Sequence, residues 1–210
     1  MSRDHILHKV RTALGRRADQ APPPPPPARI VVPSIGADAR IDSFCERLEA
    51  LAGKTYRAKS HGDALDYVRR VVADRPAVAS NAPLLRECGV TGLPTVRSGL
   101  TDRDVLRELC SSAAVGITSA DYCLADTGTL VMIASHEEAR LISLLPPAHV
   151  AVVSRARMLG SLDELLAAVP LPGEQSSSMV LITGPSRTAD IEQILVRGVH
   201  GPGEIHVVMV

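Results

Sequence analysis

The chain has 210 residues, 45% of them hydrophobic and 22% charged, a balance typical of a globular domain that excludes global disorder. Basic and acidic residues each number 23, so the formal net charge is zero and the basic excess of a dedicated nucleic-acid-binding protein is absent. With aromatic residues at only 2% and no apolar run long enough to cross a bilayer, we expect one domain with a short appendage, no nucleic-acid partner and no membrane span.

The N-terminal segment has the pattern of an amphipathic helix followed by a stiff spacer. Its apolar residues recur on one stripe of a helix, at Ile6, Val10, Ala13 and Leu14. Six prolines follow at positions 22–27, and such a run adopts an extended polyproline helix. We therefore divide the chain into a helical arm (1–20), a proline-rich linker (21–29) and one domain (30–210). The arm is held away from the domain, docks on it, or docks on a neighbouring subunit of a homo-oligomer; the alternative is a plain spacer.

From Ile41 onward, helical and strand patterns alternate. Apolar residues at helical spacing predict helices at 41–53, 65–72, 83–87, 102–110 and 162–169. Short apolar runs predict strands at 54–58, 77–79, 95–97, 113–118, 128–134, 149–153, 179–183 and 204–210. The later strands are rich in valine and isoleucine, as strands covered on both faces are. The alternation predicts an α/β fold, a three-layer α/β/α domain with a largely parallel sheet.

The cysteines give no sign of a metal or cofactor. They stand at positions 45, 88, 110 and 123, and no pair has the CxxC spacing of a zinc ribbon or a locally bound iron–sulfur cluster. We therefore predict no metal site, no cofactor bound by an evident motif, and four free thiols in a reducing cytoplasm. Positions 1–16 contain charged residues where a secretory signal would have an apolar core. This pattern also favours a cytoplasmic location.

The sequence has no common P-loop, dinucleotide-binding, serine-hydrolase or zinc-peptidase motif. The remaining candidates for a functional site are three polar clusters. Each cluster follows or begins a predicted strand, where ligands of open α/β sheets gather. The first spans residues 116–121 and 125–129, with Asp126 as candidate acid, base or nucleophile. Its candidate ligand-binding residues are Thr118, Thr127, Gly128 and Thr129. The alternative is a turn whose side chains bond local amides.

The second cluster is the run 144–149, Leu-Leu-Pro-Pro-Ala-His, ahead of a predicted strand. His149 at the start of that strand is a candidate catalytic residue. The alternative is a structural histidine in the core. The nearby His136, with Glu137 and Glu138, has the pattern of a solvated turn.

The third cluster spans residues 183–190 and 198–203. A helix is predicted to begin near Ser186 or Thr188. Its free amides, the hydroxyls of these two residues, Gly184 and Arg187 would suit an anion, so all four are candidate ligand-binding residues. Asp190 in the first turn would oppose that anion, so a capped helix with an Asp190–Arg187 ion pair is the alternative. His200 either stabilises the turn before the last strand or faces a pocket, and is a third candidate catalytic residue.

Five ordered runs resemble the LUD-domain family, and within it the lactate utilization protein C type, over about residues 41–210. They are residues 116–121 (GITSAD), 125–129 (ADTGT), 144–149 (LLPPAH), 184–191 (GPSRTADI) and 198–202 (GVHGP). The resemblance implies a Rossmann-like α/β/α sandwich similar to ribose-5-phosphate isomerase, glucosamine-6-phosphate deaminase and CoA transferases. The family often has glutamate where Asp126 stands, so the shorter side chain narrows the roles available to this carboxylate.

The resemblance also implies a function and partners. Bacterial members act with two iron–sulfur proteins, the A and B types, in oxidising L-lactate to pyruvate. Because this chain has no CxxCxxC run, clusters are expected on those partners only. We therefore expect an accessory component that binds a small organic anion or a cofactor. The alternatives are a stand-alone enzyme acting on a phosphorylated or CoA-linked small molecule, and a non-catalytic scaffold. A mechanism requires that Asp126, His149, Arg187 and His200 open onto one crevice.

Overall fold

A computed structural model describes residues 2–17, 20–21, 24, 35–169, 173, 176–189 and 195–210. The chain divides into two compact units, Met1–Val31 and Val32–Val210. The first contains helix α1 (Arg3–Ala13), where the Ser2 hydroxyl accepts a hydrogen bond from the His5 amide. Ile6, Val10 and Leu14 are all exposed on this helix, so the predicted apolar stripe is present and uncovered. Most of the predicted linker lies outside the described residues, and a role of the arm in oligomerisation stays a prediction.

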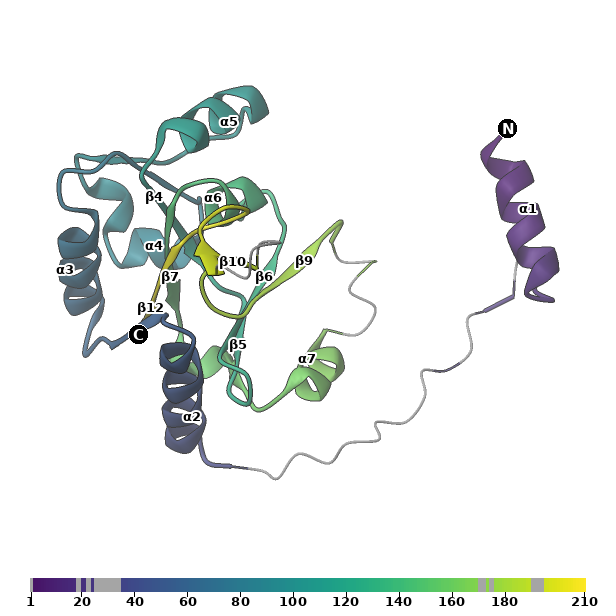
Figure 1. The fold of residues 1–210 in the computed structure, drawn as a ribbon, viewed down its shortest axis with the longest axis horizontal. Coiled ribbons are helices and arrows are strands. Elements are labelled where there is room, and N and C mark those ends of the chain that lie inside the picture. The colour runs from purple at the N-terminus through teal and green to yellow at the C-terminus, as the bar shows by residue number, and fades with distance from the viewer. Residues whose placement is uncertain are drawn as a thin grey trace. The chain divides into compact units, whose positions relative to one another are not determined.

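A six-stranded sheet forms the centre of the second unit (Figure 1). In spatial order its strands are β1 (Lys54–Arg57), β12 (Glu204–Met209), β7 (Ala148–Val153), β4 (Val115–Ser119), β2 (Ala77–Ala79) and β3 (Val96–Arg97). Every neighbouring pair is parallel. Strands β12, β7 and β4 are central and almost wholly buried, which explains why their sequences are continuous apolar runs rather than alternating ones.

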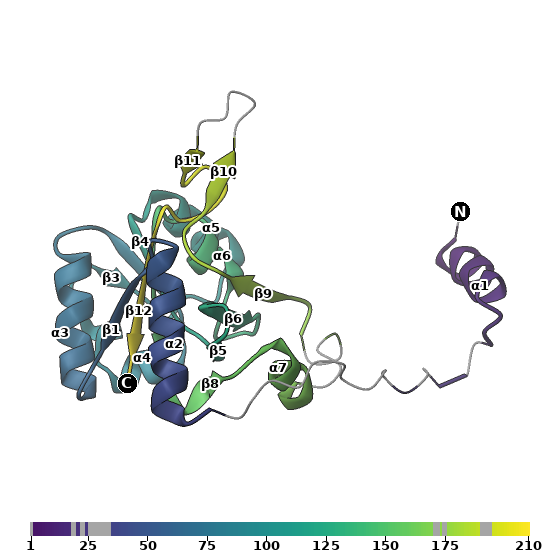
Figure 2. The same cartoon turned by 60° about the horizontal axis from the view of Figure 1, so that its bottom comes forward.

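Helices cover both faces of this sheet, as the sequence predicts; Figure 2 shows α3 and α2 on either side of β1 and β12. One face packs against α3 (His61–Val72) and α4 (Pro83–Glu87), with Val150 and Val152 of β7 in that core. The other face packs against α2 (Ala37–Ala50), with Ala151 and Val153 in the core. Helices α5 (Arg103–Ser112) and α6 (Arg140–Leu144) contact Val78 in a further cluster. Alternate residues of each strand thus serve opposite layers.

A second, smaller sheet packs on the α2 side of the molecule. Its order is β8 (Met158–Leu159), β5 (Tyr122–Leu124), β6 (Thr129–Ile133) and β9 (Met179–Ile182). The predicted strands at 128–134 and 179–183 exist, but their expected place in the parallel sheet is wrong: β6 pairs antiparallel with both β5 and β9. A tight turn at 125–128 joins β5 to β6, and such a turn can only connect antiparallel strands.

The remaining elements are short. They are the 3-10 turns at Val90–Gly92 and Arg155–Arg157, helix α7 (Leu162–Ala168), and the strands β10 (Arg187–Ala189) and β11 (Leu195–Arg197). Leu165 anchors α7 on the second sheet beside Leu124 and Val131. Strands β10 and β11 form an antiparallel hairpin (Figure 2). Among the helices of the described residues, none combines the length and apolarity needed to cross a bilayer.

Candidate functional site

The first predicted cluster lies on the turn between β5 and β6. Asp126 is exposed there, and its amide donates to the Gly160 carbonyl oxygen at 3.1 Å. Gly128 has a φ of +67°, and a Cβ at this position would lie 2.6 Å from the Leu48 amide nitrogen of α2. Glycine is therefore required for the turn to pack against α2. These contacts give Gly128 a structural role, and the role of the Asp126 carboxylate stays a prediction.

Hydroxyl groups link this turn to the third cluster. The Thr127 hydroxyl oxygen lies 2.7 Å from that of Thr129, which lies 2.8 Å from that of Thr183 at the end of β9. The Thr127 hydroxyl also donates to the Asp126 carboxylate at 3.3 Å. The first and third clusters, separated by more than fifty residues in the chain, therefore adjoin in space. Their roles as ligand-binding groups stay predictions.

His149 lies inside the core and is fully buried on β7. Its Nε2 lies 2.8 Å from the hydroxyl oxygen of Thr118 on the neighbouring strand β4. Burial lowers the pKa of His149 to about 4, so the ring is neutral near pH 7. Its Nδ1 has no hydrogen-bond partner among the described residues. The arrangement matches the alternative of a structural histidine, with Thr118 as its partner rather than a ligand-facing hydroxyl.

The third cluster is built differently from its prediction. Residues 187–189 form strand β10, so the helix expected to begin near Ser186 or Thr188 is absent there, and no helix N-terminus is available for an anion. The local reason is pairing with β11, in which Thr188 lies opposite Val196. Arg187 donates to the Leu51 carbonyl oxygen instead of facing an anion site. Asp190, and with it the proposed ion pair, lies outside the described residues.

A small cavity of about 200 Å³ does collect part of this cluster. Gly184, Ser186 and His200 line it together with Thr183 and Ser143. The loop after β11 reaches it because the Ser186 amide donates to the Pro202 carbonyl oxygen at 2.8 Å. Asp126, His149 and Arg187 are not among the residues that line this cavity. In the described part of the chain, the four side chains expected in one crevice are therefore not gathered there.

A larger cleft of about 520 Å³ opens at the carboxyl ends of β2, β4 and β7, the edge where ligands of parallel α/β sheets bind. We call it the carboxyl-edge cleft. Its polar lining residues are Glu87, Ser119, Asp121, Tyr122, Ser154 and Arg157. No sequence pattern points to Arg157, and Asp121 is one of several polar residues in the first cluster, with nothing in the pattern to single it out. The lining residues of the cleft come together only because β2, β4 and β7, which are far apart in the chain, lie side by side in the sheet.

Asp121 is the acidic group of the cleft that is partly shielded from water. Its Oδ2 accepts a hydrogen bond from the Ile133 amide at 2.7 Å. Burial raises the pKa of Asp121, while the Ile133 amide and the positive charge of Arg157 act in the opposite direction. Arg157 lies with its guanidinium carbon 5.3 Å from the Tyr122 ring centroid and forms no salt bridge within the described residues. Within the part of the chain that the structure describes, the cleft thus offers a cation that has no salt-bridge partner.

Glu138 lies directly behind the cleft. Its Oε1 accepts hydrogen bonds from the Ser119 amide at 2.8 Å and the Ser80 hydroxyl at 2.9 Å. The residue is only 8% exposed, so the prediction of a solvated turn is wrong for Glu138, although His136 and Glu137 are exposed. Burial, with a smaller effect of neighbouring negative charges, raises the pKa of Glu138 to about 8.

No local signal distinguishes Glu138 from its exposed neighbours. It precedes Ala139, the extended N-cap residue of α6, so helical spacing does not relate it to the buried residues of that helix. The turn-like pattern of 136–138 gives no sign that one of its carboxyl groups is buried.

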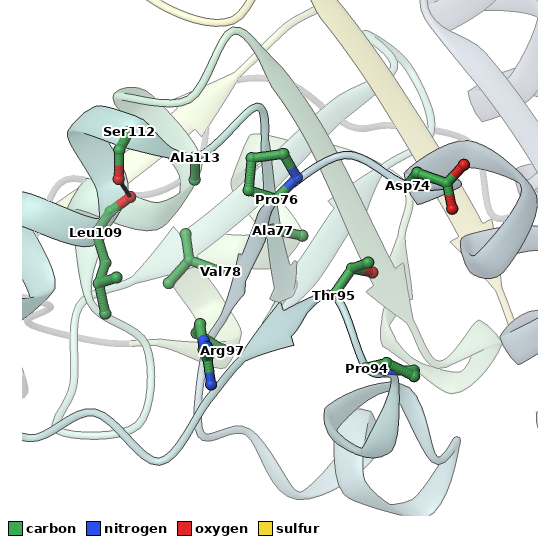
Figure 3. Close-up of a pocket in the computed structure, with 10 residues that line it drawn as sticks. All are labelled: Asp74, Pro76, Ala77, Val78, Pro94, Thr95, Arg97, Leu109, Ser112 and Ala113. Atoms are coloured by element: carbon green, nitrogen blue, oxygen red, sulfur yellow. Dashed lines mark hydrogen bonds between the residues drawn. The ribbon is translucent and has the colours of Figure 1, made fainter.

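Another cavity, of about 320 Å³, lies between β2, β3 and the end of α5 (Figure 3). Its charged lining residues are Asp74 and Arg97, whose side chains lie on separated parts of its rim. This cavity lacks the converging polar groups of the carboxyl-edge cleft. Within the described residues no three histidine, cysteine, aspartate or glutamate side chains are placed to hold a metal ion, and the four cysteines are buried free thiols.

Comparisons with known proteins agree with this fold. The LUD domain family model matches residues 41–210. Lactate utilization protein C of Halalkalibacterium halodurans is 33% identical over 147 residues, 66% of this chain and 64% of the relative. Lactate utilization protein C of Anoxybacillus flavithermus is 30% identical over 163 residues, 75% of this chain and 73% of the relative. The match to the first relative thus spans less than two thirds of that protein's length.

A solved structure supports the architecture as well. The crystal structure of a DUF162 family protein from Deinococcus radiodurans superposes with a TM-score of 0.65, covering 84% of this chain and 99% of that one. At 16% identity this likeness bears on the fold alone. The family model spans most of the second unit, including every strand of the parallel sheet. The chain therefore belongs to the LUD domain family.

Proposed function

We propose that the protein serves lactate utilization as a component that binds a small organic anion in the carboxyl-edge cleft. The observation that carries the proposal is Arg157, a cation without a salt-bridge partner among the described residues, at the edge of the sheet where this fold class binds ligands. A guanidinium group suits a carboxylate because its donors match the two carboxylate oxygens. The names of the relatives supply the metabolic setting.

The proposal includes iron–sulfur proteins of the A and B types as partners that carry the electron-transfer centres, and a cytoplasmic location. The buried free thiols support a reducing compartment. The alternative of a stand-alone enzyme acting on a phosphorylated or CoA-linked molecule loses its main support, because the loop expected to bind phosphate leads into a hairpin and Arg187 bonds to the main chain. No specific observation favours it over the first function.

Removing Arg157 is expected to weaken binding of L-lactate or pyruvate at least tenfold, because a hydrogen bond to a charged group is worth about 1.5–3 kcal/mol. The measurement is isothermal titration calorimetry of each acid into the full-length protein and into Arg157→Ala. Arg103→Ala is the matched control, since it removes an exposed arginine at the start of α5 and should leave the affinity unchanged. Equal affinities of wild type and Arg157→Ala would exclude the cleft, and no binding by wild type would exclude the anion-binding role.

Deleting the gene is expected to impair growth of the source organism on L-lactate in a strain without other lactate dehydrogenases. A wild-type copy or Arg103→Ala should restore growth, and Arg157→Ala should not. Growth rates with L-lactate and with pyruvate as sole carbon source measure the effect. Unimpaired growth of the deletion strain on L-lactate would contradict the proposed role.

A further inference from the structure

A buried carboxyl group lies at the carboxyl end of β4. Glu138 is tied to the last residue of that strand by the hydrogen bond from the Ser119 amide. Asp121 stands two residues farther along, held by the Ile133 amide, and both Ser119 and Asp121 line the carboxyl-edge cleft. The negative charge of Asp121 acts on Glu138 and opposes its ionisation. Glu138 is therefore a titratable group bonded directly to the lining of the ligand space.

The environment of Glu138 suits a neutral carboxylic acid. Its Oε2 is buried and has no hydrogen-bond partner within the described residues. A carboxylate placed there would lose its hydration and gain no compensating donor at this oxygen, which is costly. A protonated Oε2 is instead a hydroxyl, a group that carries no charge and that can donate to a nearby acceptor.

Charged groups of both signs surround Glu138. Glu137 in the same loop is exposed and lies 3.9 Å from Arg86 of α4, which offsets its charge. Glu87 and Arg157 are further charged groups of the cleft lining. If every carboxyl group were ionised, a bound carboxylate would meet one cation of the cleft and several like charges. Binding of an anion is therefore favoured when Glu138 carries a proton.

We propose that the carboxyl-edge cleft binds a small carboxylic acid together with one proton, which Glu138 holds. The inference rests on the proposed anion-binding function and names the site of the proton. The only covalent change is an O–H bond formed at a carboxylate oxygen of Glu138, with the proton taken from solvent, and nothing is oxidised or reduced. Glu138 acts through Ser119, whose amide donates to it, and is a positioning residue, whereas Arg157 holds the ligand carboxylate.

Calorimetric titrations of pyruvate into the full-length protein between pH 6 and pH 10 test the inference. Wild-type affinity should fall about tenfold per pH unit above the pKa of Glu138, and buffers of different ionisation enthalpy should reveal uptake of one proton in that range. Glu138→Gln fixes a neutral side chain of the same shape, so its affinity should change much less over the same range. Glu137→Gln, a neighbouring and exposed position, should retain the wild-type profile.

Three results would overturn the inference. Wild-type affinity independent of pH with no proton uptake excludes the coupled proton while leaving the anion-binding function intact. A Glu138→Gln profile that coincides with the wild-type profile shows that Glu138 does not hold the proton. Binding of neither L-lactate nor pyruvate removes both proposals. Should Glu138→Gln fail to fold, Glu138→Met, a neutral side chain of similar length, provides the same comparison. Infrared spectra give a ligand-independent check, because the band of a protonated carboxyl group should disappear in Glu138→Gln at pH 7.

Discussion

Replacing Gly116 by alanine is expected to destabilise the protein by about 3 kcal/mol or more, which exceeds the usual cost of overpacking. A Cβ at this position of β4 would lie 1.8 Å from the Ile142 carbonyl oxygen and 3.1 Å from Cγ of Pro146. The carbonyl belongs to helix α6, so relief requires movement of main chain rather than rotation of a flexible side chain. Moving α6 would disturb the packing of Ile142 against α5 and β2.

The matched control is Gly62→Ala in the first turn of α3. A Cβ there would lie 3.8 Å from its nearest neighbour, the Ser60 hydroxyl oxygen, and the residue is exposed. Its effect should stay within about 0.5 kcal/mol. Urea unfolding followed by circular dichroism measures both variants, and equal midpoints for Gly116→Ala, Gly62→Ala and wild type would show that α6 does not approach β4 as closely as the structure has it.

The positions of most helices and strands follow from local sequence pattern. The Val/Ile-rich runs at β4, β7 and β12 predict buried parallel strands because residues covered on both faces need no polar alternation. The second sheet cannot be predicted from local sequence pattern, because β5 covers only Tyr122–Leu124 and lies within a polar cluster. Three residues are too few to establish a strand pattern, and without β5 the hairpin that makes β6 antiparallel is invisible in the sequence.

The candidate site shows a similar division. Local pattern singled out Thr129 and Thr183 as polar groups beside strands, and their hydroxyls do meet. Pattern alone did not distinguish a buried carboxyl group from a solvated one. Glu138 is held by Ser80, which precedes it by 58 residues, so its burial is a property of the assembled sheet. The protonation of Glu138 depends on its burial and on its partners. Because Ser80 is distant in the chain, the local sequence around Glu138 does not reveal this environment.

The buried carboxyl group also predicts how stability depends on pH. Glutamate has an ordinary pKa of 4.5, which we take for the unfolded chain, whereas burial raises the pKa of Glu138 to about 8 in the folded chain. The folded state therefore binds more protons between these values, and the free energy of unfolding falls as pH rises through this window. At 1.36 kcal/mol per pKa unit, the complete loss is about 5 kcal/mol. Stability from this group is fully present below pH 4.5 and absent above pH 8.

Glu138→Gln should remove this loss, because glutamine cannot ionise and keeps an acceptor for the Ser80 hydroxyl and the Ser119 amide. Relative to wild type, the variant should therefore gain about 4 kcal/mol between pH 5 and pH 9, measured by urea unfolding at both values. His149, whose lowered pKa reduces stability on the acid side of pH 6.5, contributes equally to both proteins and cancels in the difference. Glu137→Gln is the control and should show no such gain, since that side chain is exposed. If the difference in free energy of unfolding between Glu138→Gln and wild type stays constant with pH, Glu138 is ionised in the folded protein. The same result would contradict the proposal that Glu138 holds a proton when the carboxyl-edge cleft binds its ligand.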